Sequence, residues 1–219
     1  MKKTLIFGVA IILLASCSAN KSEDKNAETE NVSTETVYAY QRAFTTLEWT
    51  AYKTSAKVGV KGSFDEFNVT TGVETGTPKE LMNQLEFSIP VSTTNSGNEI
   101  RDPKIIESFF GTMMNTENIT GKFTSISGND SAGTTRIAIT MNDVEHEVDG
   151  SYTIDGNEIT LTTDLNLGDW KAEPSVASLN EVCSDLHKGE DGSSVLWPDV
   201  NIVITSKLKP IKQAVASNE

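Results

Sequence analysis

Apolar and polar residues alternate along much of the chain, and this pattern predicts β-strands. In an extended strand successive side chains point to opposite faces, so a period of two collects the apolar residues on one face. The alternation is clearest in residues 47–52, 84–91 and 136–141. We therefore expect each of these segments to form a strand with one buried face.

Turn residues between such runs favour an antiparallel arrangement. Asp155-Gly156 separates residues 151–154 from residues 158–163, and Asp-Gly is a strong hairpin signal. A further strand is expected near residues 200–208, where apolar side chains recur at alternate positions. Many strands joined by tight turns indicate an all-β protein, either an antiparallel barrel or a sandwich.

Two segments instead repeat at helical spacing and predict short helices packed on the β structure. In residues 102–110, Asp102 is expected to cap the helix and Pro103 to be its first helical residue. The second helix is expected over residues 174–188 and should end at Gly189. Each has one apolar face, formed by Ile105, Ile106, Phe109 and Phe110 in the first helix and by Val176, Leu179, Val182, Cys183 and Leu186 in the second.

The N-terminus has the features of a secretory signal. Two lysines precede an apolar run that is too short to span a bilayer. The run closes with Leu14-Ala15-Ser16-Cys17, which resembles a bacterial lipobox. We expect residues 1–16 to be a lipoprotein signal peptide and Cys17 to carry acyl chains such as palmitate, which anchor a protein without a transmembrane helix. The alternative is an ordinary signal peptide with an incidental cysteine.

The remaining chain divides into a tether, one domain and a tail. Residues 17–36 comprise the lipidated cysteine and a polar stretch with almost nothing to bury, so a flexible tether is expected. Residues 37–210 suit a single domain, and residues 211–219 a C-terminal tail. Because Ser18 rather than an aspartate follows the cysteine, we expect a lipid-anchored protein of the Gram-negative cell envelope, in the outer membrane and facing the periplasm or the surface.

Charge and motifs exclude several functions. With 31 acidic and 18 basic residues the net charge is −13, which argues against nucleic-acid partners. Strand alternation would place Glu145 and Glu147 on the opposite face from His146, so the three would not converge on a metal. No nucleophile elbow, phosphate loop or dinucleotide motif is present. We predict no catalytic residue, metal or cofactor apart from a bound lipid or quinone.

Ordered motifs across residues 45–208 resemble the YceI-like, lipocalin-like family. Residues 49–53 and 58–64 resemble its opening strands, and the segments at 119–126 and 135–141 resemble later ones. The family's "T-x-N-x-x-R-D" turn, followed by a short helix ending in Phe-Phe, is matched by Thr94, Asn98, Arg101, Asp102, Phe109 and Phe110. The resemblance implies an eight-stranded antiparallel barrel with one or two short helices, whose apolar cavity binds polyisoprenoids such as polyprenyl phosphates or quinones.

The same resemblance suggests the site residues. The turn and first helix would plug one barrel end, with Asn98, Arg101 and Asp102 fixing the turn or contacting a ligand head group. Both phenylalanines and Trp49 could equally be ordinary core. The predicted ligand-binding side chains are Trp49, Phe64, Phe87, Ile89, Ile106, Phe109, Phe110, Phe123, Ile137, Ile139 and Leu161.

Three functional hypotheses follow from these features. The first is a non-enzymatic, extracytoplasmic lipoprotein that binds an isoprenoid-type lipid for carriage, storage or protection. The second is an envelope interaction module with a side-chain-filled barrel, engaging a protein partner through its acidic surface or through residues 167–197. The third is an enzyme acting on a quinone or lipid carrier, for which the sequence offers no nucleophile.

Overall fold

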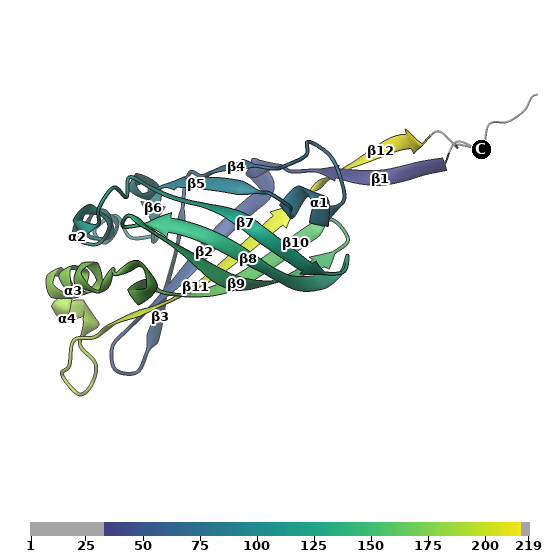
Figure 1. Ribbon diagram of the computed structural model, residues 1–219. Coiled ribbons are helices and arrows are strands. Elements are labelled where there is room, and N and C mark those ends of the chain that lie inside the picture. Colours follow the sequence, from purple (N-terminus) through teal and green to yellow (C-terminus); the bar gives the residue numbers. More distant parts are fainter. Residues whose placement is uncertain (1–32, 216–219) are drawn as a thin grey trace, which may run out of the picture.

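The computed structural model describes residues 33–215, so the predicted signal peptide and Cys17 lie outside the described residues. Its main element is a ten-stranded antiparallel sheet that curls into an open half-barrel (Figure 1). In spatial order the strands are β4 (Asn68–Thr70), β5 (Glu86–Pro90), β7 (Asn118–Gly128), β8 (Ala132–Met141), β9 (Val144–Asp155), β10 (Glu158–Asn166), β11 (Leu196–Lys207), β2 (Thr45–Lys53), β3 (Val58–Phe64) and β6 (Thr94–Asn95).

The expected eight-stranded barrel is wrong in strand number and in closure. The sheet ends at β4 and β6, which have three and two residues. After β3 the chain crosses to the opposite edge of the sheet, where β4 pairs with β5. From β5 it returns through the 3-10 turn η2 (Val91–Thr93) to β6, which pairs with β3. Strands this short carry no readable alternation, and their number could not be predicted from the pattern.

The predicted strands themselves are confirmed. In β2 the side chains of Leu47 and Trp49 are buried, as the alternation requires. The Asp-Gly hairpin joins β9 to β10, with Asp155 paired to Glu158 and Gly156 at a φ of +60°. This left-handed backbone favours glycine, which explains the residue at the turn.

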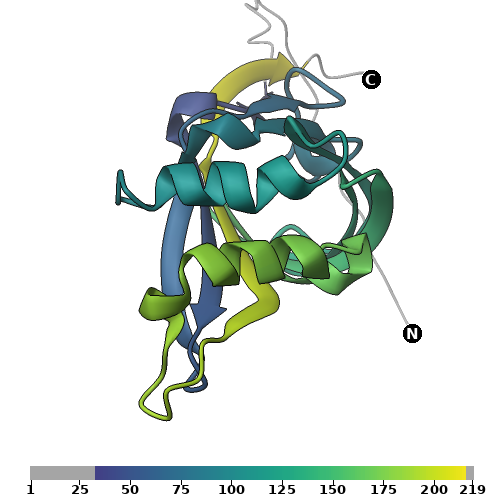
Figure 2. The ribbon, with the colours of Figure 1, turned by 90° about the vertical axis from the view of Figure 1, so that its left-hand side faces the viewer.

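Short helices close the two ends of the half-barrel. Helix α1 (Pro78–Met82) covers one end, and α2 (Asp102–Ser108), α3 (Glu173–Val182) and α4 (Ser184–His187) gather at the other (Figure 1). Seen from that end, α2 and α3 lie side by side across the opening (Figure 2). The Thr112 hydroxyl, in the 3-10 turn η3 (Phe110–Thr112), donates to Ser175 Oγ at 2.8 Å and links the two helical segments. None of the helices in residues 33–215 is long and apolar enough to cross a membrane.

Two details of the predicted helices are corrected. Asp102 is the first helical residue rather than the cap, and its carboxylate accepts a hydrogen bond from the backbone N–H of Ser96 at 2.8 Å. The second helix breaks at Cys183, and α4 ends at His187, before Gly189. Val176 and Cys183 of the expected apolar face are buried, whereas Val182 and Leu186, on either side of the break, are 46% and 59% exposed.

The two ends of the described segment form a separate ribbon. Strand β1 (Ser33–Ala39) pairs with β12 (Lys209–Val215) over seven residue pairs and projects from the α1 end of the half-barrel (Figure 1). Residues 33–36 and 211–215, which were assigned to the tether and the tail, are therefore paired strands. The alternation did not reveal them, because a two-stranded ribbon outside the main sheet needs no continuous apolar face.

Candidate functional site: an apolar cavity inside the half-barrel

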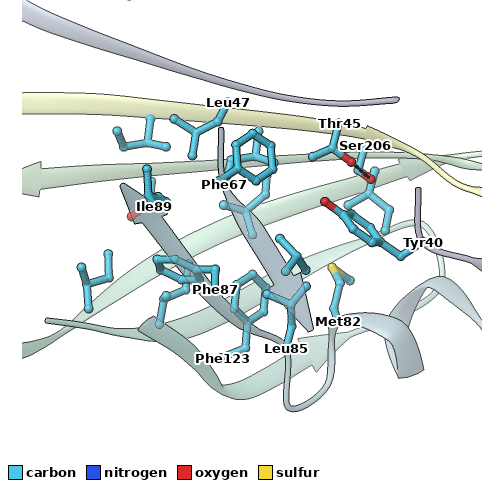
Figure 3. A pocket seen from close by; sticks show the side chains of 18 of the residues that line it. Tyr40, Thr45, Leu47, Phe67, Met82, Leu85, Phe87, Ile89, Phe123 and Ser206 are labelled. Atoms are coloured by element: carbon cyan, nitrogen blue, oxygen red, sulfur yellow. Dashed lines mark hydrogen bonds between the residues drawn. The ribbon is translucent and has the colours of Figure 1, made fainter. Parts of the chain in front are cut away.

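The half-barrel is hollow, with a main cavity of about 160 Å³. Its wall is formed by the inner faces of the strands, and α1 contributes Leu81 and Met82 to the lining. Figure 3 shows Met82 directed into the cavity. The lining residues are Tyr40, Thr45, Leu47, Phe64, Phe67, Val69, Thr71, Leu81, Met82, Leu85, Phe87, Ile89, Ile119, Phe123, Ile137, Ile139, Met141, Ile159, Leu161, Thr163, Leu165, Ile202, Ile204, Ser206 and Leu208.

This lining is suited to an apolar molecule. Within the described part of the chain it contains no charged side chain, and its few polar groups are hydroxyls. Two of these satisfy each other, because Thr45 Oγ1 lies 2.8 Å from Ser206 Oγ (Figure 3). Apolar cavities of this kind stay dry and accept apolar ligands.

The Tyr40 hydroxyl is the unsatisfied polar group of the cavity. It is buried, and no group among residues 33–215 meets the geometry of a hydrogen bond to it. The Thr45 hydroxyl is nevertheless near enough to oppose part of the effect of burial on the Tyr40 pKa. Figure 3 shows it directed into the cavity beside the Thr45–Ser206 pair. Burial raises the pKa of Tyr40 above its ordinary value of 10.0, so the hydroxyl stays protonated and can donate a hydrogen bond.

Replacing Tyr40 with phenylalanine is expected to stabilise the ligand-free protein. An unpaired buried hydroxyl costs about 1–3 kcal/mol, and the variant removes it while keeping the ring. The matched control is Tyr152→Phe, because the Tyr152 hydroxyl bonds the carbonyls of Ser127 and Asn129, each at 3.2 Å. Urea unfolding should show a gain of about 1 kcal/mol for Tyr40→Phe and a loss of about 1 kcal/mol for Tyr152→Phe. A loss of stability in both variants would show that the Tyr40 hydroxyl has a hydrogen-bond partner.

A second apolar cavity, of about 130 Å³, lies beneath α2 and α3. Five side chains line both this cavity and the main one: Phe64, Ile119, Met141, Leu165 and Ile202. On the helical side it is bounded by Phe109 and Phe110, whose rings meet edge to face with centroids 4.8 Å apart. The two apolar cavities therefore adjoin one another inside the half-barrel.

Most predicted ligand-binding residues face these two cavities. The main cavity is lined by Phe64, Phe87, Ile89, Phe123, Ile137, Ile139 and Leu161, and the second by Trp49, Phe64, Phe109 and Phe110. Ile106 lines neither cavity and is only half-buried on α2. The sequence analysis did not identify Tyr40, Phe67 and Met82 as lining residues. Tyr40 and Phe67 lie in loops and Met82 lies in α1, so none of them belongs to a segment with alternating apolar residues.

The predicted turn residues hold the segment before α2. Arg101 Nε donates to Ser96 Oγ at 2.7 Å, and the Asp102 carboxylate bonds the same residue. The Asn98 carboxamide oxygen accepts from the backbone N–H groups of Ile100 and Arg101 at 3.0 and 3.1 Å. Asn98 and Arg101 also line a third cavity beside α2, whereas Asp102 does not.

The Glu145-His146-Glu147 segment diverges as predicted. His146 packs edge to face on Trp170, with ring centroids 5.3 Å apart. Glu147 faces the other side, where it accepts a hydrogen bond from Thr124 at 2.7 Å and pairs with Arg136. In residues 33–215, histidine, cysteine and carboxylate side chains form no group of three suited to a metal ion.

The fold and the cavity together define a hollow, open antiparallel β half-barrel. Residues 38–206 match the model of the YceI-like domain, and the chain belongs to this family. No curated protein is significantly similar to the chain.

Two solved structures have a similar fold. BcnA of Burkholderia cenocepacia is 12% identical, with a TM-score of 0.56, over 78% of this chain and 99% of that one. A polyisoprenoid binding domain from Saccharophagus degradans, implicated in plant cell wall breakdown, is 11% identical, with a TM-score of 0.52, over 80% of this chain and 98% of that one. At such low identity the similarity establishes the shared fold.

Proposed function

We propose that the protein binds one apolar, isoprenoid-type chain, as in a polyprenyl phosphate or a quinone, inside the half-barrel. The observation that carries the proposal is the pair of adjoining cavities, whose described lining is apolar and uncharged. Burying an isoprenoid there removes apolar surface from water, at about 25 cal/mol per Å². The proposed role is carriage, storage or protection of the lipid, without a catalytic step.

The lining of the two cavities and the family both support an isoprenoid. A cavity lined by branched and aromatic side chains complements a slender, methyl-branched chain. The structural neighbour from Saccharophagus degradans is described as a polyisoprenoid binding domain. The alternative of an interaction module with a side-chain-filled barrel does not account for the free volume of about 160 Å³ in the main cavity.

The proposal predicts that affinity depends on chain length. We expect binding of isoprenoid alcohols to tighten with each added isoprene unit until both cavities are filled, and then to level off. Each methylene buried contributes about 0.8 kcal/mol, so one unit should improve the dissociation constant at least ten-fold at first. Isothermal titration of lipid-stripped protein with geraniol, farnesol and geranylgeraniol measures this. Equal, weak binding of all three would contradict an extended apolar site.

We further propose that Cys17 anchors the protein to the outer membrane of a Gram-negative envelope. The support is the lipobox-like Leu14-Ala15-Ser16-Cys17, which lies outside the described residues. Two or more acyl chains are expected to anchor it stably. Cys17→Ser should move the protein from the membrane fraction to the soluble fraction and remove palmitate labelling. An unchanged distribution between the fractions would exclude this anchor.

A further inference from the structure

Three hydroxyl groups meet at the α1 end of the main cavity. Tyr40 follows the last residue of β1, Thr45 begins β2, and Ser206 lies one residue before the end of β11. Figure 3 shows the Tyr40 hydroxyl beside the Thr45–Ser206 pair, near Met82 of α1. The second cavity, beneath α2 and α3, has no hydroxyl-bearing side chain in its described lining. The two adjoining cavities therefore have one polar end.

The hydroxyl protons of the main cavity can be counted, and the count singles out Tyr40. Because Thr45 donates its proton to the Gln41 carbonyl, Ser206 supplies the proton of the Thr45–Ser206 pair. No acceptor among residues 33–215 takes the proton of Tyr40. The other lining hydroxyls have their acceptors within the protein: Thr45 donates at 3.1 Å, Ser206 at 2.8 Å, Thr71 to the Val73 carbonyl at 2.7 Å, and Thr163 to the Asp149 carbonyl at 2.9 Å.

The Tyr40 hydroxyl is therefore a donor that lacks an acceptor inside the protein. Buried polar groups are nearly always hydrogen-bonded, because an unpaired one has lost its water without a replacement. Burial also raises the pKa of Tyr40, which keeps its proton on the oxygen. Since the hydroxyl is directed into the cavity, an oxygen of a molecule bound there would supply the missing acceptor (Figure 3).

The surroundings of Tyr40 favour an uncharged acceptor. Arg42 is the cation whose charge acts on the Tyr40 pKa, but its Nε and Nη2 donate to the carbonyls of Phe67 and Asp65 at 3.0 and 2.9 Å. Its guanidinium carbon also lies 3.5 Å from the centroid of the Phe67 ring. Arg42 is not part of the cavity lining, which has no charged side chain in the described part of the chain. An anion buried there would lose its water without gaining an ion partner.

We propose that Tyr40 is a specificity-determining residue whose hydroxyl donates a hydrogen bond to an uncharged, carbonyl-type oxygen at one end of the bound apolar chain. The inference rests on the proposed function and deepens it, because it sets the orientation of the ligand. The oxygen lies at the α1 end, and the hydrocarbon chain extends towards α2 and α3. A site built to hydrogen-bond an oxygen discriminates against an analogue that lacks it, because its own polar group then stays unpaired.

The test compares an ester with a hydrocarbon of the same isoprenoid type. Methyl farnesoate and farnesene are titrated into lipid-stripped protein, and tryptophan fluorescence reports binding. Tyr40→Phe keeps the ring and removes only the donor. It should weaken binding of methyl farnesoate about ten-fold and change that of farnesene less than two-fold. Tyr152→Phe is the matched control, because Tyr152 does not line the cavity and its hydroxyl already bonds backbone carbonyls. It should change neither affinity.

The possible results separate this inference from the proposed function. Equal weakening of both ligands by Tyr40→Phe would mean that Tyr40 acts only through packing, and unchanged binding of both would mean that it donates no hydrogen bond to the ligand. Either result would overturn the role of Tyr40 and leave apolar-chain binding intact. Binding of neither ligand by the wild-type protein would refute the proposed function and this inference with it.

A third ligand tests whether the oxygen has to be uncharged. Farnesoic acid at about pH 8 carries a carboxylate in place of the ester group on the same chain. It should bind the wild-type protein at least ten-fold more weakly than methyl farnesoate, because the cavity offers its charge a neutral donor and no cation. Equal or tighter binding of the acid would show that this end of the cavity accepts an anion, and it would overturn the assignment to an uncharged oxygen.

Discussion

Replacing Leu161 with tryptophan is expected to weaken the binding of an isoprenoid chain at least ten-fold, or by about 1.4 kcal/mol. Leu161 lies in the middle of β10, is 3% exposed, and faces the main cavity. An indole at this position occupies the space that the ligand needs. Filling a cavity with apolar atoms commonly leaves the fold intact or stabilises it, so the loss should be specific to binding.

The matched control is Thr162→Trp, because Thr162 neighbours Leu161 on β10 and does not line the cavity. It adds an indole to the same strand on the other face and should leave affinity unchanged. Farnesol binding by titration calorimetry, together with urea unfolding of both variants, measures the two effects. Unaltered affinity in a folded Leu161→Trp variant would mean that the ligand binds elsewhere.

Truncating Trp170 to alanine should cause the largest loss of stability, about 3–5 kcal/mol. Trp170 ends the 3-10 turn η4 (Leu167–Trp170) and is fully buried. Its indole N–H donates to the Ile139 carbonyl at 2.9 Å, and its own carbonyl accepts from Asn142 Nδ2 at 2.9 Å. The variant leaves a large void and an unpaired carbonyl where the helical segment joins the sheet.

Trp197→Ala provides the comparison. Trp197 also donates an indole hydrogen bond, to the Thr54 carbonyl at 2.8 Å, but it is only half-buried. We expect a smaller loss of stability, about 1–2 kcal/mol, because a half-buried indole removes less apolar surface from water and its deletion leaves no enclosed void. Chemical denaturation should separate the two variants. Similar losses would mean that Trp170 does not connect the helical end to the sheet.

Alternation in the sequence was sufficient to locate the long strands and the Asp155-Gly156 hairpin, because each has one buried face and a distinctive turn. It could not reveal β4 and β6, which are too short to show a period. It also could not reveal the ribbon of β1 and β12, because these two strands pair with each other and not with the main sheet. The break at Cys183 depends on packing of the helical segment and leaves no breaker residue in the sequence.

The cavity was partly predictable for the same reason. Inward positions such as Phe87, Ile137 and Leu161 follow from alternation and from the family resemblance, and the structure places them around the cavity. The third cavity, beside α2, was not predictable beyond Arg101 and Asn98. Lys53 and His187 come from β2 and α4, which are distant in sequence and meet only in the folded chain.

The central claim, that the half-barrel holds an isoprenoid-type lipid, is tested most directly by comparing native and denaturing mass spectra of the protein purified from bacteria. The account predicts a stoichiometric mass excess that is present in the native spectrum, absent after denaturation, and recovered as an isoprenoid in solvent extract. A native mass equal to that of the bare chain, unchanged after incubation with quinones and polyprenyl phosphates, would contradict it.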